Sequence, residues 1–311
     1  MSVKNEAVDM SPKVETSIAG IRFQNPVMNA SGTFGNSGEY SQVIDLKDLG
    51  AIVTKGVSMV PWEGNGTPRV AETPSGMMNA IGLQNPGVEA FLDRDLPVLR
   101  GFGTKIIVNI CGHSIEEYEA VSERLSEIEG IDMLEVNVSC PNVKEGGIAF
   151  GTDPGKLSLV TRSIRKRTKR PIILKLSPNV TSIADMARAA ESEGADAVSL
   201  INTFTAMKID IRQRKFFLAN GTGGLSGPAI HPIAVRMVYE AAHAVKLPII
   251  GMGGIASGAD AIEMMMAGAS AVAVGMMQFS RPSILIDVKN QIRDFLIDEG
   301  IGDIREIIGI L

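Results

Sequence analysis

The chain has 311 residues, of which 45% are hydrophobic and 21% charged, a composition that excludes intrinsic disorder and is ordinary for a globular protein. Thirty basic and 35 acidic residues give a formal net charge of -5, which disfavours a nucleic-acid-binding surface because such a surface needs a basic excess. The two cysteines, Cys111 and Cys140, are too few for a structural zinc site or an iron–sulfur cluster.

Neither a targeting segment nor a membrane span is expected from the sequence. Residues 1–15 are polar and lack the apolar core of a signal peptide. The most apolar stretch, residues 261–277, is interrupted by Glu263 and Ser270, so it is not the uninterrupted apolar run that crosses a bilayer. Low cysteine usage fits a reducing compartment, and we therefore expect a cytoplasmic protein without membrane attachment.

Short apolar runs alternate with amphipathic helical patterns along the chain, which predicts eight strand–helix units closed into one (β/α)8 barrel domain over residues 1–311. A doubly wound sheet is the alternative, because it shares this alternation and differs only in closure. The predicted strands are Val27–Ala30, Ala51–Thr54, Lys105–Ile110, Met133–Val138, Ile172–Leu176, Ala197–Ile201, Pro248–Gly251 and Ala271–Gly275. The predicted helices include Ser114–Glu129, Asp153–Thr168, Thr181–Glu193, Pro228–Val245 and Ser257–Ala267.

Three segments interrupt the alternation. Glu15–Phe23, with Ala19 and Gly20 at its turn, predicts a hairpin before the first barrel strand. Ser58–Pro86 and Asn202–Gly227 follow the second and sixth strands. Because the carboxyl ends of barrel strands carry the active site, we expect these two insertions to be substrate loops or lids.

Polar residues stand where the apolar strands end, which predicts a shared polar ligand on that face of the barrel. Leaving one such group buried without a partner costs roughly 1–3 kcal/mol. A helix cap or a turn explains a single Asn or Ser, but it explains less well the two lysines, Lys55 and Lys175. The full set is Asn29, Ser31, Lys55, Asn109, Asn137, Ser139, Lys175, Asn202 and Thr203.

Glycines follow the seventh and eighth strands, in Gly251–Ile255 and Val274–Met277. In barrels, the loops at these two places often bind phosphate through backbone N–H groups. Turn chemistry alone explains one such motif, whereas both together favour a ligand that carries a phosphate.

Cys140 directly follows the fourth strand and is the candidate proton acceptor, because a thiol can be tuned by its neighbours for this role. The alternative is a buried space-filling cysteine, which is the interpretation we prefer for Cys111. Of the histidines, His113 follows the third strand and is able to reach the site, whereas His231 and His243 are expected to be surface or hydrogen-bonded residues on a helix.

These residues lie in motifs that resemble the dihydroorotate dehydrogenase family of flavin enzymes, and the resemblance runs through almost the whole chain. The motifs are Asn29–Gly35, Pro68–Thr73, Asn79–Gly87, Asn137–Asn142, Lys175–Asn179, Gly223–Pro228 and Gly251–Gly254.

The resemblance implies oxidation of dihydroorotate to orotate in pyrimidine synthesis, with FMN as cofactor and Cys140 as the base. Residues implied to contact the flavin ring are Ser31, Lys55, Gly56, Asn109, Asn137, Lys175 and Ile201. Those implied to line its ribityl and phosphate end are Gly227, Gly253, Gly254, Gly275 and Met276. Those implied to hold the substrate are Lys55, Asn79, Ala80, Ile81, Gly82, Leu83, Asn137, Asn202 and Thr203. Many relatives have Thr at position 276, so a hydroxyl contact to phosphate is lost here, although the backbone N–H remains.

The cysteine in Asn137–Asn142 resembles the soluble class 1 enzymes, and Asn79–Gly87 resembles the NAD-linked subclass 1B. This chain has no dinucleotide fingerprint and too few cysteines for a cluster. The resemblance therefore implies a partner subunit that carries FAD and a [2Fe–2S] cluster, in a heterotetramer of two catalytic and two partner chains.

Three alternatives stay open at the level of sequence. Within the family, the competitor is the homodimeric, fumarate-dependent class 1A enzyme. Outside it, a non-flavin barrel aldolase or isomerase acting on a sugar phosphate would use Lys175 as a Schiff base. A barrel that has lost catalysis and serves as a binding scaffold ranks last, because the polar residues at its strand ends should then be eroded.

Overall fold

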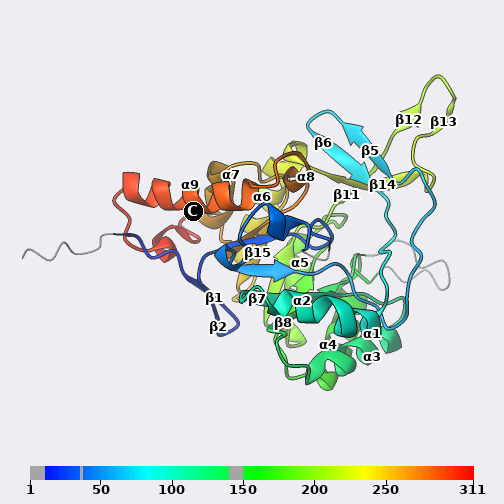
Figure 1. Ribbon diagram of the computed structural model, residues 1–311, viewed down its shortest axis with the longest axis horizontal. Coiled ribbons are helices and arrows are strands. Elements are labelled where there is room, and N and C mark those ends of the chain that lie inside the picture. The colour runs from blue at the N-terminus through cyan, green and yellow to red at the C-terminus, as the bar shows by residue number, and fades with distance from the viewer. Residues whose placement is uncertain (1–10, 36–37, 140–149) are drawn as a thin grey trace, which may run out of the picture.

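The computed structural model describes residues 11–35, 38–139 and 150–311. Its centre is a closed barrel of eight parallel strands in the order β10-β15-β16-β3-β4-β7-β8-β9 (Figure 1). This closure confirms the predicted (β/α)8 barrel and rules out the doubly wound sheet. The barrel strands are β3 (Val27–Asn29), β4 (Ala51–Val53), β7 (Lys105–Ile110), β8 (Met133–Asn137), β9 (Ile172–Lys175), β10 (Ala197–Leu200), β15 (Ile249–Met252) and β16 (Ala271–Val274).

The barrel strands lie within one residue of their predicted ends, because nearly every position in them is buried on one face or the other. One set of side chains points into the barrel, and the other packs under the surrounding helices. A parallel strand covered on both faces is therefore recognisable as an unbroken apolar run.

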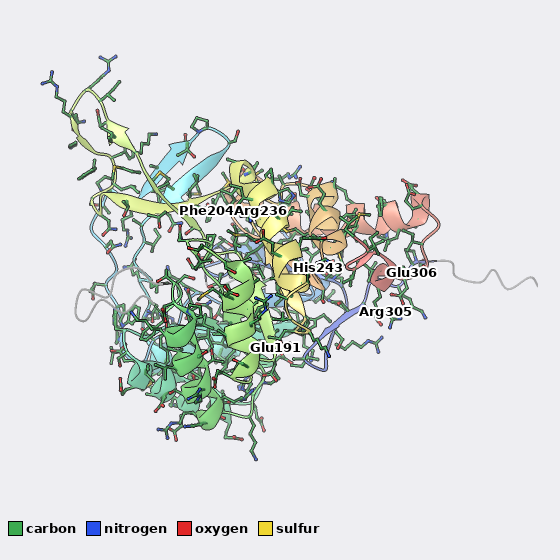
Figure 2. All side chains as sticks on the ribbon, turned by 180° about the vertical axis from the view of Figure 1, so that it is seen from behind. Glu191, Phe204, Arg236, His243, Arg305 and Glu306 are labelled. Atoms are coloured by element: carbon green, nitrogen blue, oxygen red, sulfur yellow. The ribbon has the colours of Figure 1, made fainter. Side chains whose placement is uncertain are left out.

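Helices cover the outside of the barrel: α1 (Val88–Ala90), η3 (Phe91–Asp95), α2 (Leu96–Arg100), α3 (Ile115–Ser126), α4 (Pro154–Arg167), α5 (Ile183–Ser192), η4 (Pro228–Ile230), α6 (His231–Ala242), α7 (Gly258–Met266), α8 (Met277–Ser280), α9 (Ile284–Asp298) and η5 (Ile304–Ile307). Five of them begin at side-chain caps, from Ser114, Asp153, Ser182, Ser257 and Asp303. Figure 2 shows α5 and α6 side by side on the outer surface, with exposed His243 near the end of α6.

The first unit departs from the predicted alternation. Between β3 and β4, the described residues form only two short 3-10 turns, η1 (Tyr40–Gln42) and η2 (Leu46–Asp48). The connection there is rich in glycine, which disfavours a helix interior.

The predicted hairpin is present as β1 (Thr16–Ile18) and β2 (Ile21–Phe23), paired antiparallel across Ala19 and Gly20. Ile18 and Phe23 are fully buried and belong to the same apolar cluster as the barrel interior. The hairpin therefore plugs the barrel at the end away from the polar strand ends.

The two insertions fold together rather than forming independent loops. The first contains β5 (Val70–Thr73) and β6 (Gly76–Asn79), and the second contains β11 (Phe204–Met207) and β14 (Thr222–Ser226). The four strands form one antiparallel sheet in the order β11-β14-β6-β5, beyond which the hairpin of β12 (Ile209–Asp210) and β13 (Lys215–Phe216) projects (Figure 1). Within the described part of the chain, no helix is both long and apolar enough to cross a membrane.

Candidate functional site

The barrel interior changes from apolar to polar along the strands. Because side chains on one face of a strand recur every two residues, the inward position that follows an apolar residue is two residues further on. Ile107, Met133, Ile173 and Ala197 lie in the buried apolar cluster of the barrel. The next inward positions hold a polar layer, which comprises Asn109, Glu135, Lys175 and Ser199.

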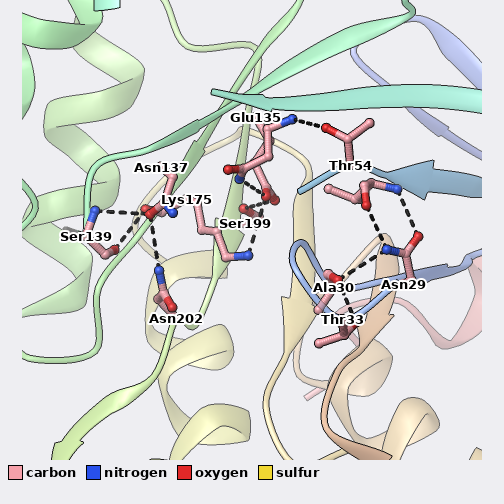
Figure 3. Close-up of polar contacts among 12 residues, drawn as sticks. Asn29, Ala30, Thr33, Thr54, Glu135, Asn137, Ser139, Lys175, Ser199 and Asn202 are labelled. Atoms are coloured by element: carbon pink, nitrogen blue, oxygen red, sulfur yellow. Dashed lines mark hydrogen bonds and ion pairs between the residues drawn. The ribbon is translucent and has the colours of Figure 1, made fainter. Parts of the chain in front are cut away.

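The polar layer is one hydrogen-bonded network (Figure 3). Asn109 Nδ2 donates to Glu135 Oε1 at 2.6 Å, and Ser199 Oγ donates to Glu135 Oε2 at 2.9 Å. Lys175 Nζ lies 3.4 Å from Glu135 Oε1, and these two side chains are only 6% and 1% exposed. A pair buried this deeply depends on both members, since removing one costs about 3–5 kcal/mol.

Glu135 is the residue that sequence reasoning missed. It stands in the middle of an apolar strand, where its neighbours Leu134 and Val136 gave the whole run the character of a buried strand. The available signal was the charge itself, because Asp and Glu are almost never fully buried without a partner.

One atom of the polar layer is left open. Asn109 Oδ1 is buried and has no hydrogen-bond partner among the described residues. Gly56 lies against it, since a Cβ at that glycine would come within 3.2 Å of Asn109 Oδ1 and 3.6 Å of Leu83 Cδ2. The structure thus brings Gly56, Asn109 and Leu83 together around an unsatisfied acceptor.

Just beyond the polar layer, Asn137 and Asn202 meet across the strand ends. Asn202 Nδ2 donates to Asn137 Oδ1 at 3.2 Å, as Figure 3 shows. The backbone carbonyl of Asn137 accepts a 2.6 Å hydrogen bond from Tyr118 Oη, which ties the end of β8 to α3. Two amide side chains are therefore held side by side, and Asn137 is the register partner of Lys175 on the neighbouring strand.

The four-stranded sheet brings the predicted substrate residues of the two insertions together. Asn79 on β6 pairs with Gly224 on β14, and a Cβ at Gly224 would lie only 2.0 Å from Thr203 Oγ1. The chain after β6 runs through residues 80–83, where Gly82 and Leu83 have φ values of +74° and +54°. Asn65 holds this turn with two hydrogen bonds that it donates. Its Nδ2 donates to Ala80 O, and its backbone N–H donates to Ile81 O.

Lys55 follows β4 and is half-buried. Burial lowers the pKa of its ammonium below the ordinary value of 10.5, and the positive charge of Arg69 lowers the pKa further. A cation held in this way favours an anionic partner, because an anion relieves both effects.

The glycines predicted to line a phosphate group lie close together. Gly227 and Gly254 have positive φ, and a Cβ at Gly254 would lie 2.8 Å from the Gly227 carbonyl oxygen. A Cβ at Gly227 would lie 3.1 Å from Met276 Cε, and one at Gly253 would lie 3.3 Å from Ile201 Cγ1. The close approach of these backbones requires glycine and brings the loops after β10, β14, β15 and β16 together.

His231 also lies in this region, where no role was predicted for it. It is buried, with Nδ1 at 2.8 Å from the Gly253 carbonyl oxygen and Nε2 at 3.1 Å from Glu263 Oε2. The expectation that it is a hydrogen-bonded residue is correct, and its partner is the backbone of the glycine loop itself.

The polar residues predicted at the end of β3 differ in what they contact. Asn29 is fully buried and staples β3 to β4, since its Nδ2 donates to Val53 O at 2.7 Å and its Oδ1 accepts from Val53 N at 2.9 Å. It is therefore a structural residue, not a ligand-facing one. Ser31 follows in a half-buried turn, and Gly275 lies beside that turn, 3.6 Å from Ala30 Cβ when given a Cβ.

Cys140, the proposed base, lies outside the described residues. Cys111 is fully buried next to Gly56, in agreement with a packing role.

A closed (β/α)8 barrel that gathers a buried Lys–Glu pair, paired amides and glycine-lined turns at the carboxyl ends of its strands has the arrangement of a barrel enzyme. Comparison with known proteins makes this specific, because the family model for dihydroorotate dehydrogenase matches residues 13–296. The chain belongs to the dihydroorotate dehydrogenase family and is an oxidoreductase.

Three relatives with high sequence identity are each described as "Dihydroorotate dehydrogenase B (NAD(+)), catalytic subunit". The protein from Lachnoclostridium phytofermentans is 60% identical over 292 residues, which cover 94% of this chain and 97% of the relative. The protein from Alkaliphilus oremlandii is 56% identical over 294 residues, again 94% and 97% of the two chains. The protein from Citrifermentans bemidjiense is 52% identical over 300 residues, 96% and 98% of the two chains.

Proposed function

We propose that this chain is a single FMN-binding barrel domain that oxidises dihydroorotate to orotate in de novo pyrimidine biosynthesis in the cytoplasm, as the catalytic subunit of an NAD-linked enzyme. The observation that carries the proposal is the polar layer of Asn109, Glu135 and Lys175, set beside glycine-lined turns in a chain of this family. The names of the relatives support the substrate and the NAD-linked type.

The residues present fit FMN. The buried and unpartnered Asn109 Oδ1 needs a donor, which the imide N–H of a flavin supplies, and the Lys175 ammonium suits the electron-rich pyrimidine end of the ring. The glycine turns at 227 and 253–254 leave no room for a Cβ, which suits backbone N–H groups that approach a phosphate. We assign the ring to Ser31, Lys55, Gly56, Asn109, Asn137, Lys175 and Ile201, and the ribityl phosphate to Gly227, Gly253, Gly254, Gly275 and Met276.

Bound FMN supplies the acceptor for the hydride that leaves C6 of dihydroorotate. The protein must remove the proton from C5, and we assign this step to the thiolate of Cys140, three residues after Asn137 in the sequence. Lys175 places a positive charge beside the flavin pyrimidine ring.

Substrate orientation is assigned to the residues that the two insertions bring together. Lys55 pairs with the carboxylate of dihydroorotate, while the amides of Asn137 and Asn202 meet the ring amides. Asn79, Ala80, Ile81, Gly82 and Leu83 approach from the first insertion, and Thr203 approaches from the second.

The test is to purify the chain and release its cofactor. We expect a yellow protein that yields one FMN per chain and forms orotate from dihydroorotate in the presence of an artificial electron acceptor. A colourless protein that becomes covalently labelled by borohydride plus a sugar phosphate would instead support the aldolase alternative, with Lys175 as the Schiff base.

A further inference from the structure

Glu135 occupies the centre of the polar layer and has no role in the mechanism described so far. It lies in the middle of β8, is 1% exposed, and its side chain contacts those of Asn109 on β7 and Lys175 on β9. A carboxylate in the interior of a barrel is costly unless its oxygens are satisfied.

Both oxygens of Glu135 are occupied by donors. Oε1 receives Asn109 Nδ2 at 2.6 Å and faces Lys175 Nζ at 3.4 Å, while Oε2 receives Ser199 Oγ at 2.9 Å. A carboxyl group surrounded by three donors is an acceptor at each contact, which is the hydrogen-bonding pattern of the ionised form.

This arrangement decides what the two neighbouring side chains present to a ligand. Because Asn109 Nδ2 donates to Glu135, the atom of this amide that remains available to a ligand is the acceptor Oδ1. Because Lys175 is paired with Glu135, its ammonium is fixed in position and its positive charge is partly offset.

We propose that Glu135 is a positioning residue that orients Asn109 and Lys175 toward the flavin and, through its negative charge, lowers the reduction potential of the flavin below the value that Lys175 alone would set. The inference rests on the proposed function, since it takes the ligand of the polar layer to be FMN. Glu135 does not itself contact the cofactor and acts through its two neighbours.

The test compares Glu135→Gln with the wild-type chain at neutral pH, with two readouts that do not depend on turnover. Binding of FMN to the apoprotein, followed by quenching of FMN fluorescence, should weaken roughly tenfold, because the glutamine amide no longer fixes the orientation of Asn109. The midpoint potential of the bound flavin should become more positive, because reduction adds negative charge to the ring and a repelling carboxylate is gone.

Lys175→Met should shift the midpoint potential of the bound flavin in the opposite direction. Removing the positive charge should move the midpoint potential to more negative values, whereas general damage to the site would move both variants in the same direction. Glu89→Gln is the matched control, since it removes an exposed carboxylate that is paired with Arg124 on the outer helices, and its potential should equal that of the wild type.

If Glu135→Gln does not fold, Glu135→Asp keeps the charge but draws it back from both neighbours. It should weaken FMN binding while leaving the potential near the wild-type value, and unchanged binding would overturn the inference. If dihydroorotate reduces the wild-type flavin but the midpoint potential in Glu135→Gln is unchanged or more negative, the inference about Glu135 is overturned while the proposed function stands. A wild-type chain that binds no FMN overturns the proposed function and the inference with it.

Discussion

The pKa of Lys55 lies below its ordinary value because of burial and the charge of Arg69, and this fixes the sign of a pH effect. Lysine is charged below its pKa, so the free site loses its cation at a lower pH than an ordinary lysine would. We expect the KM for dihydroorotate to rise on the alkaline side as this charge disappears. Lys55→Arg should abolish the rise, because guanidinium stays charged. The measurement is KM against pH for both proteins, and an equally steep rise in the Arg variant would contradict the assignment.

Cys140 is the second residue with a sharp expectation. Cys140→Ala should retain FMN but slow its reduction by dihydroorotate by about two powers of ten or more, because the C5 proton loses its acceptor. Cys140→Ser should keep some activity with a pH optimum shifted upward, since a hydroxyl is a weaker acid than a thiol. Stopped-flow absorbance measures both rates, and native-rate reduction in the Ala variant would end this assignment.

At the residue level, sequence patterns predicted position better than partnership. The apolar runs in the sequence correctly predicted that Asn109, Asn137 and Lys175 lie at or near the carboxyl ends of barrel strands, because the end of an apolar run is a local signal. Asn29 satisfies the same pattern yet bonds to Val53, and Glu135 fails the pattern yet holds the network together. Partners on neighbouring strands are set by barrel register, which a single strand does not encode.

At the scale of elements, the barrel was predictable and the sheet above it was not. Buried parallel strands are continuous apolar runs, whereas β14 is Thr-Gly-Gly-Leu-Ser and has no strand-like composition. Its glycines are there because β6 and Thr203 approach too closely for side chains. A contact between segments that lie more than a hundred residues apart leaves no local pattern in either of them.

The close approach at β14 gives a test of the sheet as a substrate platform. In Gly224→Ala the new methyl group would meet Thr203 Oγ1 and displace the Thr203 side chain. We expect the KM for dihydroorotate to rise roughly tenfold or more while FMN stays bound, because Thr203 is assigned to the substrate, whereas Gly227, which is assigned to the phosphate, lies three residues beyond the substitution. Gly66→Ala is the control, since it lies in the same pair of insertions with open space around it, and it should behave as the wild type. Equal KM values in the two variants would remove the sheet from substrate binding.

At the scale of the whole molecule, the electrons must leave the barrel. We propose that NAD is reduced through a second polypeptide that carries FAD and a [2Fe–2S] cluster, in a heterotetramer of two catalytic and two partner chains. The proposal follows from the family resemblance and from a chain with no dinucleotide fingerprint and only two cysteines. The isolated chain should reduce an artificial dye with dihydroorotate but should not reduce NAD until the partner is added. Efficient NAD reduction by the chain alone would contradict the two-subunit arrangement, and rapid turnover with fumarate would move the protein to the homodimeric class 1A.

An anaerobic measurement tests whether this barrel holds FMN where dihydroorotate reduces it. Dihydroorotate is added to the purified chain in the absence of any acceptor while the flavin absorbance is recorded. We expect the visible flavin bands to bleach, with about one orotate formed per FMN. A flavin spectrum that dihydroorotate leaves unchanged, or a chain that carries no flavin, would contradict this expectation.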